Sequence, residues 1–201
     1  LFYVKLPNEK FGKITGIVAK EFLILIGNGK NTIKELLEKD PRYQLQLKVL
    51  EEEYREKLNE ILKLDETINL VPYGNHCRGT KFIDASNLIT LKLTDTFNEV
   101  CNQIDGFNYG RMDIMFNSYE ELENGVNFQI VEINGAISEP THIYDPNHSL
   151  LYGWKELTKH FHYLYVISKQ NKQKGHPYLT FKQGVREFKK HNEYYNAILE
   201  F

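Results

Sequence analysis

The sequence predicts an α+β protein in which an antiparallel sheet comes first and helices gather toward the C-terminal end. Residues 109–116 and 128–134 are two strand-like segments, and a short polar connection joins them. After Trp154 the pattern changes to two helical segments, which Lys174-Gly175-His176-Pro177 separates. Strands followed by helices are typical of the α+β class.

Further elements are expected before and between these two strands. Thr32 and Glu35, like Ser118 and Glu121, have the spacing of a capping box, which predicts a helix beginning at each site. The remaining expected elements are strands at 2–4, 22–26, 68–73 and 80–83, a longer helix from Pro41 through about residue 62, and a helix over 94–103.

Composition is ordinary for a soluble globular protein. Hydrophobic residues make up 41% and charged residues 26% of the 201 residues, and the formal net charge is −2. This charge favours neither nucleic acid nor a membrane as partner, and no apolar run approaches the roughly 20 residues that span a bilayer. Cys77 and Cys101 form no metal-binding pattern, and we expect reduced thiols in a cytoplasmic protein. The sequence is compatible with a homodimer.

The domain organisation is expected to comprise a catalytic portion over residues 1–153 and a helical extension over 154–201 that packs on it. The chain begins with Leu1, and residues 2–4 have the composition of the middle of a strand. We therefore expect that the chain starts inside a larger protein.

Two carboxylates are expected to converge in the paired strands. Alternation places Arg111 and Asp113 on one face of the first strand, and Glu132 and Asn134 on one face of the second. Antiparallel pairing can bring Asp113 near Glu132, and a cation would then have to neutralise them. Oxygen ligands of this kind favour magnesium or manganese over zinc. The alternative is that both acids are structural and pair with Arg111 or a lysine.

The Arg-x-Asp strand followed by Val131-Glu132-Ile133-Asn134-Gly135 resembles the metal-binding end of the ATP-grasp superfamily. This superfamily includes D-alanine–D-alanine ligase, glutathione synthetase and the cyanophycin synthetases. Upstream, residues 27–36 are similar to a Gly-Asp-Gly-Lys-x-Thr-x-x-Glu-Leu stretch of cyanophycin-synthetase-like members. The resemblance covers roughly residues 5–145.

The resemblance implies an ATP-dependent carboxylate–amine ligase that forms an amide or peptide-like bond through an acyl-phosphate. It implies ATP and two Mg²⁺ ions, or Mn²⁺, held by Asp113, Glu132 and Asn134, while Arg111 assists phosphoryl transfer. Lys5 stands near the place of a nucleotide-binding lysine, but no glycine-rich lid follows it, so an N-terminal lobe is expected to be missing.

Two further segments hold candidate binding residues. In the loop 74–79, Arg78 can bind a phosphate or carboxylate, and Asn75 and His76 are candidates for substrate contact; a solvated loop is the alternative. After the metal-binding strand, residues 135–146 replace the usual Pro-Gly turn and resemble a D-alanine–D-alanine ligase-like group. The dipeptide substrate is therefore not implied, and Glu139 and His142 are candidate contacts to a small-molecule carboxylate or amine.

Two alternative functions follow from other features of the sequence. His142, Asp145 and His148 could hold a metal in a hydrolase, although no His-Glu-x-x-His pattern accompanies them. A ligase domain that has lost catalysis could also act as a binding module.

Overall fold

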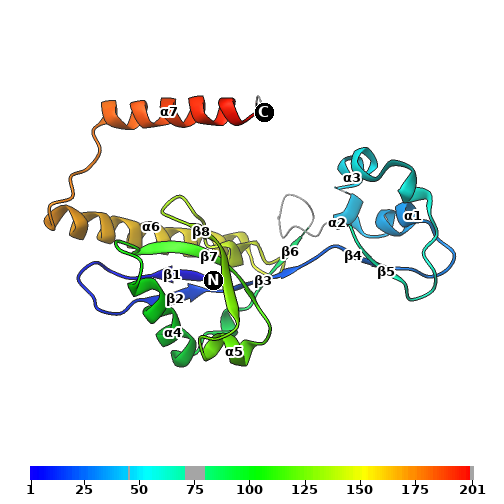
Figure 1. Cartoon of the computed structure of the whole chain (residues 1–201), viewed down its shortest axis with the longest axis horizontal. Helices are drawn as coiled ribbons and strands as arrows, with labels where there is room; N and C mark the ends of the chain where they lie inside the picture. Colours follow the sequence, from blue (N-terminus) through cyan, green and yellow to red (C-terminus); the bar gives the residue numbers. More distant parts are fainter. Residues whose placement is uncertain (45, 71–79, 200–201) are drawn as a thin grey trace.

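The centre of the molecule is a four-stranded antiparallel sheet (Figure 1), in a computed structural model that describes residues 1–44, 46–70 and 80–199. The strand order is β2-β1-β7-β8. These strands are β1 (Phe2–Val4), β2 (Lys13–Gly16), β7 (Tyr109–Phe116) and β8 (Phe128–Asn134). The last two have the boundaries that the sequence predicts, and the α+β class is confirmed.

Helices cover both faces of this sheet. Helices α4 (Leu91–Asn102) and α5 (Tyr119–Glu123) pack on one face and α6 (Leu150–Gln173) on the other (Figure 1). Successive residues of a strand point to opposite faces, so β1 contributes to two cores. Tyr3 and Met112 pack under α4, whereas Phe2, Val4 and Tyr109 pack against α6.

A second lobe extends from the sheet through a two-stranded ribbon. Strand β3 (Val18–Glu21) pairs with β6 (Lys81–Asp84), and β4 (Ile24–Ile26) pairs with β5 (Thr67–Asn69) (Figure 1). The lobe has its own core, formed by Leu23, Leu25, Ile33, Leu37, Leu50, Leu58, Leu62 and Leu70. Its helices are α1 (Ile33–Glu38), α2 (Pro41–Gln44), α3 (Leu47–Tyr54) and the 3₁₀ helix η1 (Arg55–Asn59).

The single longer helix expected from Pro41 onward is wrong, because the chain forms three short helices there. Helix α3 ends at Tyr54 because the next residue, Arg55, has a φ of 47°, outside the helical region, and Gln46 provides no side-chain cap at the start of the helix. By contrast, the capping box of Thr32 and Glu35 forms with both reciprocal bonds. Capping depends on residues only three apart, so it is predictable from sequence.

The C-terminal region consists of two helices with different surroundings. Helix α6 begins at Leu150, capped by Ser149, so the boundary expected after residue 153 falls inside it. Helix α7 (Phe181–Leu199) follows residues 174–180 and has no buried residue (Figure 1). Two shorter 3₁₀ helices, η3 (Ser86–Leu88) and η4 (Thr141–Tyr144), lie earlier in the chain. Within the described ranges, no helix combines the length and apolarity needed to cross a bilayer.

One histidine lies buried between α6 and the sheet. The Nδ1 atom of His160 is 3.1 Å from the Tyr109 hydroxyl, and Phe2 meets the imidazole edge-on. Burial is the main cause that lowers the pKa of His160 to about 4; the charges of His142 and Lys159 contribute to this shift, and Glu156 opposes it. His160 is therefore neutral in the folded protein at neutral pH.

Replacing Phe97 tests the main core. Phe97 is fully buried and lies 5.9 Å from the Phe128 ring, so Phe97→Ala should lower the free energy of unfolding by about 3–5 kcal/mol. Leu91→Ala, on the same helix but 86% exposed, is the control and should change it by less than about 0.5 kcal/mol. Urea denaturation measures both, and equal effects would contradict the described packing.

Acid should destabilise the protein through His160. Between the ordinary histidine pKa of 6.5 and the folded pKa of about 4, the unfolded chain binds a proton that the folded chain excludes. Stability should thus fall as pH drops through this window. Thermal unfolding across it should show a shallower pH dependence for His160→Phe than for the unchanged chain. His162→Gln, on the exposed side of α6, should retain the original dependence.

Candidate functional site

The polar residues predicted on β7 and β8 lie opposite one another in the sheet. Asp113 pairs with Glu132, and Arg111 pairs with Asn134. Directly opposed residues of antiparallel strands have Cβ atoms about 4.5–5.5 Å apart. The predicted antiparallel pairing is therefore confirmed, and it gathers two carboxylates, an amide and a guanidinium on one face.

A β-bulge makes this arrangement compatible with the core. The register shifts after Asp113, so Ile114 pairs with Ile130 and Val131 is the extra residue. Strict alternation would place Ile130 on the same face as Glu132. The bulge instead turns Ile130 toward the α4 core while Glu132 stays opposite Asp113.

Val131 and Ile133, the apolar residues that alternate with Glu132 and Asn134, do not form part of the buried core. Val131 is 59% and Ile133 45% exposed, whereas Phe128 and Ile130 pack against the core under α4. The bulge accounts for the exposure of Val131, and the alternation pattern alone does not reveal it. Ile133 pairs with the buried Met112 and keeps the face that alternation gives it.

Two cations reach Asp113 from different strands. Lys20 of β3 places its Nζ 2.7 Å from Oδ2, and Arg111 places its Nε 3.3 Å from Oδ1. Burial raises the pKa of Asp113, but the hydrogen bond and charge of Lys20 and the charge of Arg111 outweigh it, so this pKa lies below its usual value. Asp113 is therefore an ionised carboxylate.

Two buried polar atoms of the cluster lack hydrogen bonds. Asn134 Nδ2 has none, and Arg111 Nε lies within ion-pair distance of Asp113 without hydrogen-bond geometry. A half-turn of the Asn134 amide exchanges its nitrogen and oxygen. A buried group without a partner is costly, and a ligand that supplies the partner removes this cost.

The donor set fits a hard divalent cation. Asp113 and Glu132 supply carboxylate oxygens, Asn134 can supply an amide oxygen, and Glu132 is exposed and open to a ligand. Across the described ranges, no three or more His, Cys, Asp or Glu side chains converge as a metal site. The third protein ligand would therefore be the amide of Asn134.

The other predicted nucleotide- and substrate-binding residues do not join this cluster. Lys5 donates a hydrogen bond to Asn102 Oδ1 at 2.5 Å. Lys5 follows the end of β1 that pairs with Tyr109, whereas Arg111 pairs with the opposite end of that strand. The structure thus places Lys5 away from Asp113. A further group lies outside the described residues: Asn75, His76, Cys77 and Arg78.

The segment after β8 holds Glu139 on the surface and His142 in the interior. Glu139 accepts a hydrogen bond from the Tyr144 hydroxyl. His142 packs so closely on Gly16 that a Cβ there would lie 2.1 Å from Nδ1, and its Nε2 is 3.7 Å from Glu156 Oε2. Burial lowers the pKa of His142, although nearby acids oppose the shift. Both side chains therefore bond within this segment and to α6.

Asp145 and His148, two of the three residues of the hydrolase alternative, hold neighbouring segments together. The two oxygens of Asp145 accept hydrogen bonds from the backbone N–H groups of Asp84 and Asn147. His148 places its Nε2 2.7 Å from Asp84 Oδ2 and stacks on Tyr152. These interactions fasten β6 to the start of α6. The predicted set of His142, Asp145 and His148 is thus not a metal site among the described residues.

Sequence reasoning missed Lys20 and Asp84. Both lie on the β3–β6 ribbon, where Val18 pairs with Asp84 and Lys20 with Phe82. Lys20 reaches Asp113 across a sequence separation of 93 residues. No local spacing signals such a contact, because it depends on how the ribbon meets the sheet.

Comparisons with known proteins give a distant structural likeness. No protein-family model matches the chain, and no curated protein matches its sequence. Among solved structures, the chain is similar to a bifunctional glutathione synthetase from Pasteurella multocida, with 13% identity and a TM-score of 0.47. The match covers 80% of this chain and 23% of that chain. A likeness of this size assigns no function, so the functional conclusion depends on the residues of the Asp113 cluster.

Proposed function

We propose that this chain is the metal- and phosphate-binding part of an ATP-dependent carboxylate–amine ligase of the ATP-grasp type. The observation that carries the proposal is the pairing of Asp113 with Glu132 and of Arg111 with Asn134 across β7 and β8. The approach of Lys20 to the same carboxylate supports it. Two acids, an amide and two cations form a set suited to a metal–nucleotide complex.

The proposed reaction joins a carboxylate to an amine in two steps. The carboxylate oxygen attacks the γ-phosphorus of ATP, ADP leaves, and the amine then attacks the acyl-phosphate carbon and releases phosphate. Asp113, Glu132 and Asn134 would hold two Mg²⁺ ions, or Mn²⁺, which neutralise phosphate charge when bound. These three residues thus orient the terminal phosphates rather than react themselves.

Arg111 and Lys20 supply positive charge beside the phosphates. Arg111 is directly opposite Asn134, so its guanidinium can stabilise the negative charge on the transferring group. Lys20 neutralises Asp113 in the structure and can donate to a phosphate oxygen when a cation takes its place. The proposal assigns both residues to charge stabilisation.

Substrate selection is proposed for Arg78, Asn75 and His76, which lie between β5 and β6 in the sequence, and for Glu139, an exposed acid that follows β8. A guanidinium can hold a carboxylate and an acid can hold an amine. These assignments concern small-molecule substrates.

Loss of either acid should weaken metal–nucleotide binding. Asp113→Asn and Glu132→Gln each remove one charged oxygen ligand, so affinity for Mn²⁺ with ATP should fall at least about tenfold, as it does when even a supporting group is lost. Electron paramagnetic resonance titration of Mn²⁺ in the presence of ATP measures this affinity. Circular dichroism verifies that both variants remain folded.

Matched controls come from α4. Asp95→Asn and Glu99→Gln make the same chemical changes at exposed positions outside the cluster and should bind Mn²⁺ and ATP normally. Unaltered affinity in Asp113→Asn and Glu132→Gln, together with normal folding, would overturn the proposed site.

Lys20→Met should shift metal and nucleotide binding in opposite directions. Lys20 occupies Asp113 Oδ2, so its removal should strengthen binding of Mn²⁺ alone. Loss of a phosphate partner should weaken ATP binding about tenfold at saturating Mn²⁺. Calorimetric titrations measure both affinities. The control is Lys81→Met on the same ribbon, because Lys81 Nζ lies 3.6 Å from Glu21 Oε2 and pairs with that acid. This variant should leave both affinities unchanged. Weaker Mn²⁺ binding by Lys20→Met would contradict the assignment.

A further inference from the structure

Charge is strongly segregated along the chain. Residues 150–199 contain nine Lys or Arg and three Asp or Glu, a net charge of +6, so the rest of the chain carries −8. The formal net charge of −2 conceals this difference. The excess positive charge therefore belongs to the segment that contains α6 and α7.

Helix α7 presents an exposed apolar stripe. Phe181, Val185, Phe188, Tyr195 and Leu199 recur at spacings of three, four and seven residues, which place them on one side of a helix. All five are exposed, and Phe181 reaches 89%. Helix α7 has no buried residue, so no described part of the chain covers this stripe.

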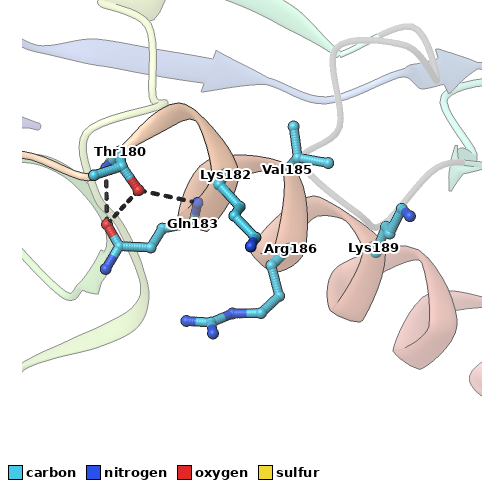
Figure 2. Close-up of a pocket in the computed structure, with 6 residues that line it drawn as sticks. All are labelled: Thr180, Lys182, Gln183, Val185, Arg186 and Lys189. Carbon is cyan, nitrogen blue, oxygen red and sulfur yellow. Dashed lines mark hydrogen bonds between the residues drawn. The ribbon is translucent and has the colours of Figure 1, made fainter.

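Basic side chains lie beside the apolar stripe of α7. Figure 2 shows Lys182, Arg186 and Lys189 on the first turns of the helix, around a hollow that also includes Val185. The start of the helix is held by hydrogen bonds between Thr180 and Gln183 (Figure 2). The stripe is thus bordered by cations on a defined helix.

Helix α6 has a second exposed apolar stripe, opposite the side that packs on the sheet. Glu156, His160 and Ile167 are buried on the inner side. The outer side presents Leu151, Trp154, Phe161 and Tyr165, of which Trp154 is 58% and Phe161 66% exposed. Leu, Phe, Trp and Tyr on one face of a basic helix have the composition of interfacial helices.

The charge identifies what fits this surface. A symmetric contact with a second copy would set the patch against itself and bring two +6 segments together. Duplex nucleic acid complements the charge, but its surface offers no apolar region that would bury a stripe of Phe, Val and Leu. An anionic lipid surface complements both features, since its headgroups attract the cations and its acyl region receives the apolar side chains.

We propose that α6 and α7 form a docking surface for an anionic lipid bilayer, with the apolar stripes of both helices lying in the plane of the interface. This surface revises the expectation of no membrane partner, which was based on the charge of the whole chain. It is independent of the ligase proposal, because its residues lie outside the Asp113 cluster.

The fluorescence of Trp154 tests the proposal directly, because it is the single tryptophan of the chain. Vesicles of phosphatidylcholine with phosphatidylglycerol should shift its emission to shorter wavelength, and brominated acyl chains should quench it. Vesicles of phosphatidylcholine alone should have little effect. High salt should weaken binding, because screening removes the attraction between the basic residues and the headgroups.

Variants separate the two components of the surface. Phe188→Asp should remove an apolar contact, and the pair Lys182→Glu and Lys189→Glu should reverse two charges; vesicle sedimentation should show about tenfold weaker binding in each case. All three positions are exposed, so the fold should persist. Leu91→Asp and Lys92→Glu make the same kinds of change on exposed positions of α4 and should bind like the unchanged chain.

Three results would overturn the proposal. Equal binding to neutral and anionic vesicles would show that charge does not drive binding. Undiminished binding by the Lys182 and Lys189 variant would show that these two residues do not contribute to it. A shift of Trp154 emission that needs no lipid and grows with protein concentration would assign the surface to a second copy instead.

Discussion

The candidate site depends on the pairing of β7 with β8 and on the bulge within it. Two demands act on these strands, because Ile114 and Ile130 must face the α4 core while Asp113 and Glu132 face the other side. A regular ladder satisfies only one of them. One extra residue, Val131, satisfies both, so hydrophobic packing and the gathering of the two acids are set by the same backbone irregularity.

Charge compensation links the site to the second lobe. Asp113 carries a partly buried negative charge, and this charge is stable because Lys20 and Arg111 approach both of its oxygens. Lys20 lies on β3, the strand that leads from the sheet to the lobe with its separate core. A bound cation would compete with Lys20 for Asp113.

Helix α6 connects the interior with the unpartnered surface. On its inner side, His160 Nδ1 lies beside the Tyr109 hydroxyl and Glu156 accepts a hydrogen bond from Lys159, while its outer side presents aromatic and aliphatic side chains to solvent. The cations concentrate in the same C-terminal segment, and the acids are distributed over the rest of the chain. The two proposed partners therefore belong to different parts of the molecule, a metal–phosphate group to the sheet and an anionic surface to the C-terminal helices.

Local sequence patterns were enough to predict the strands at 109–116 and 128–134, the cap at Thr32 and the polar residues of the site, because alternation and capping act between near neighbours. The contact of Lys20 with Asp113 and the exposure of Val131 in place of Ile130 were not predictable in this way. Contacts between distant segments and the location of a bulge depend on packing of the whole molecule, which no local pattern encodes.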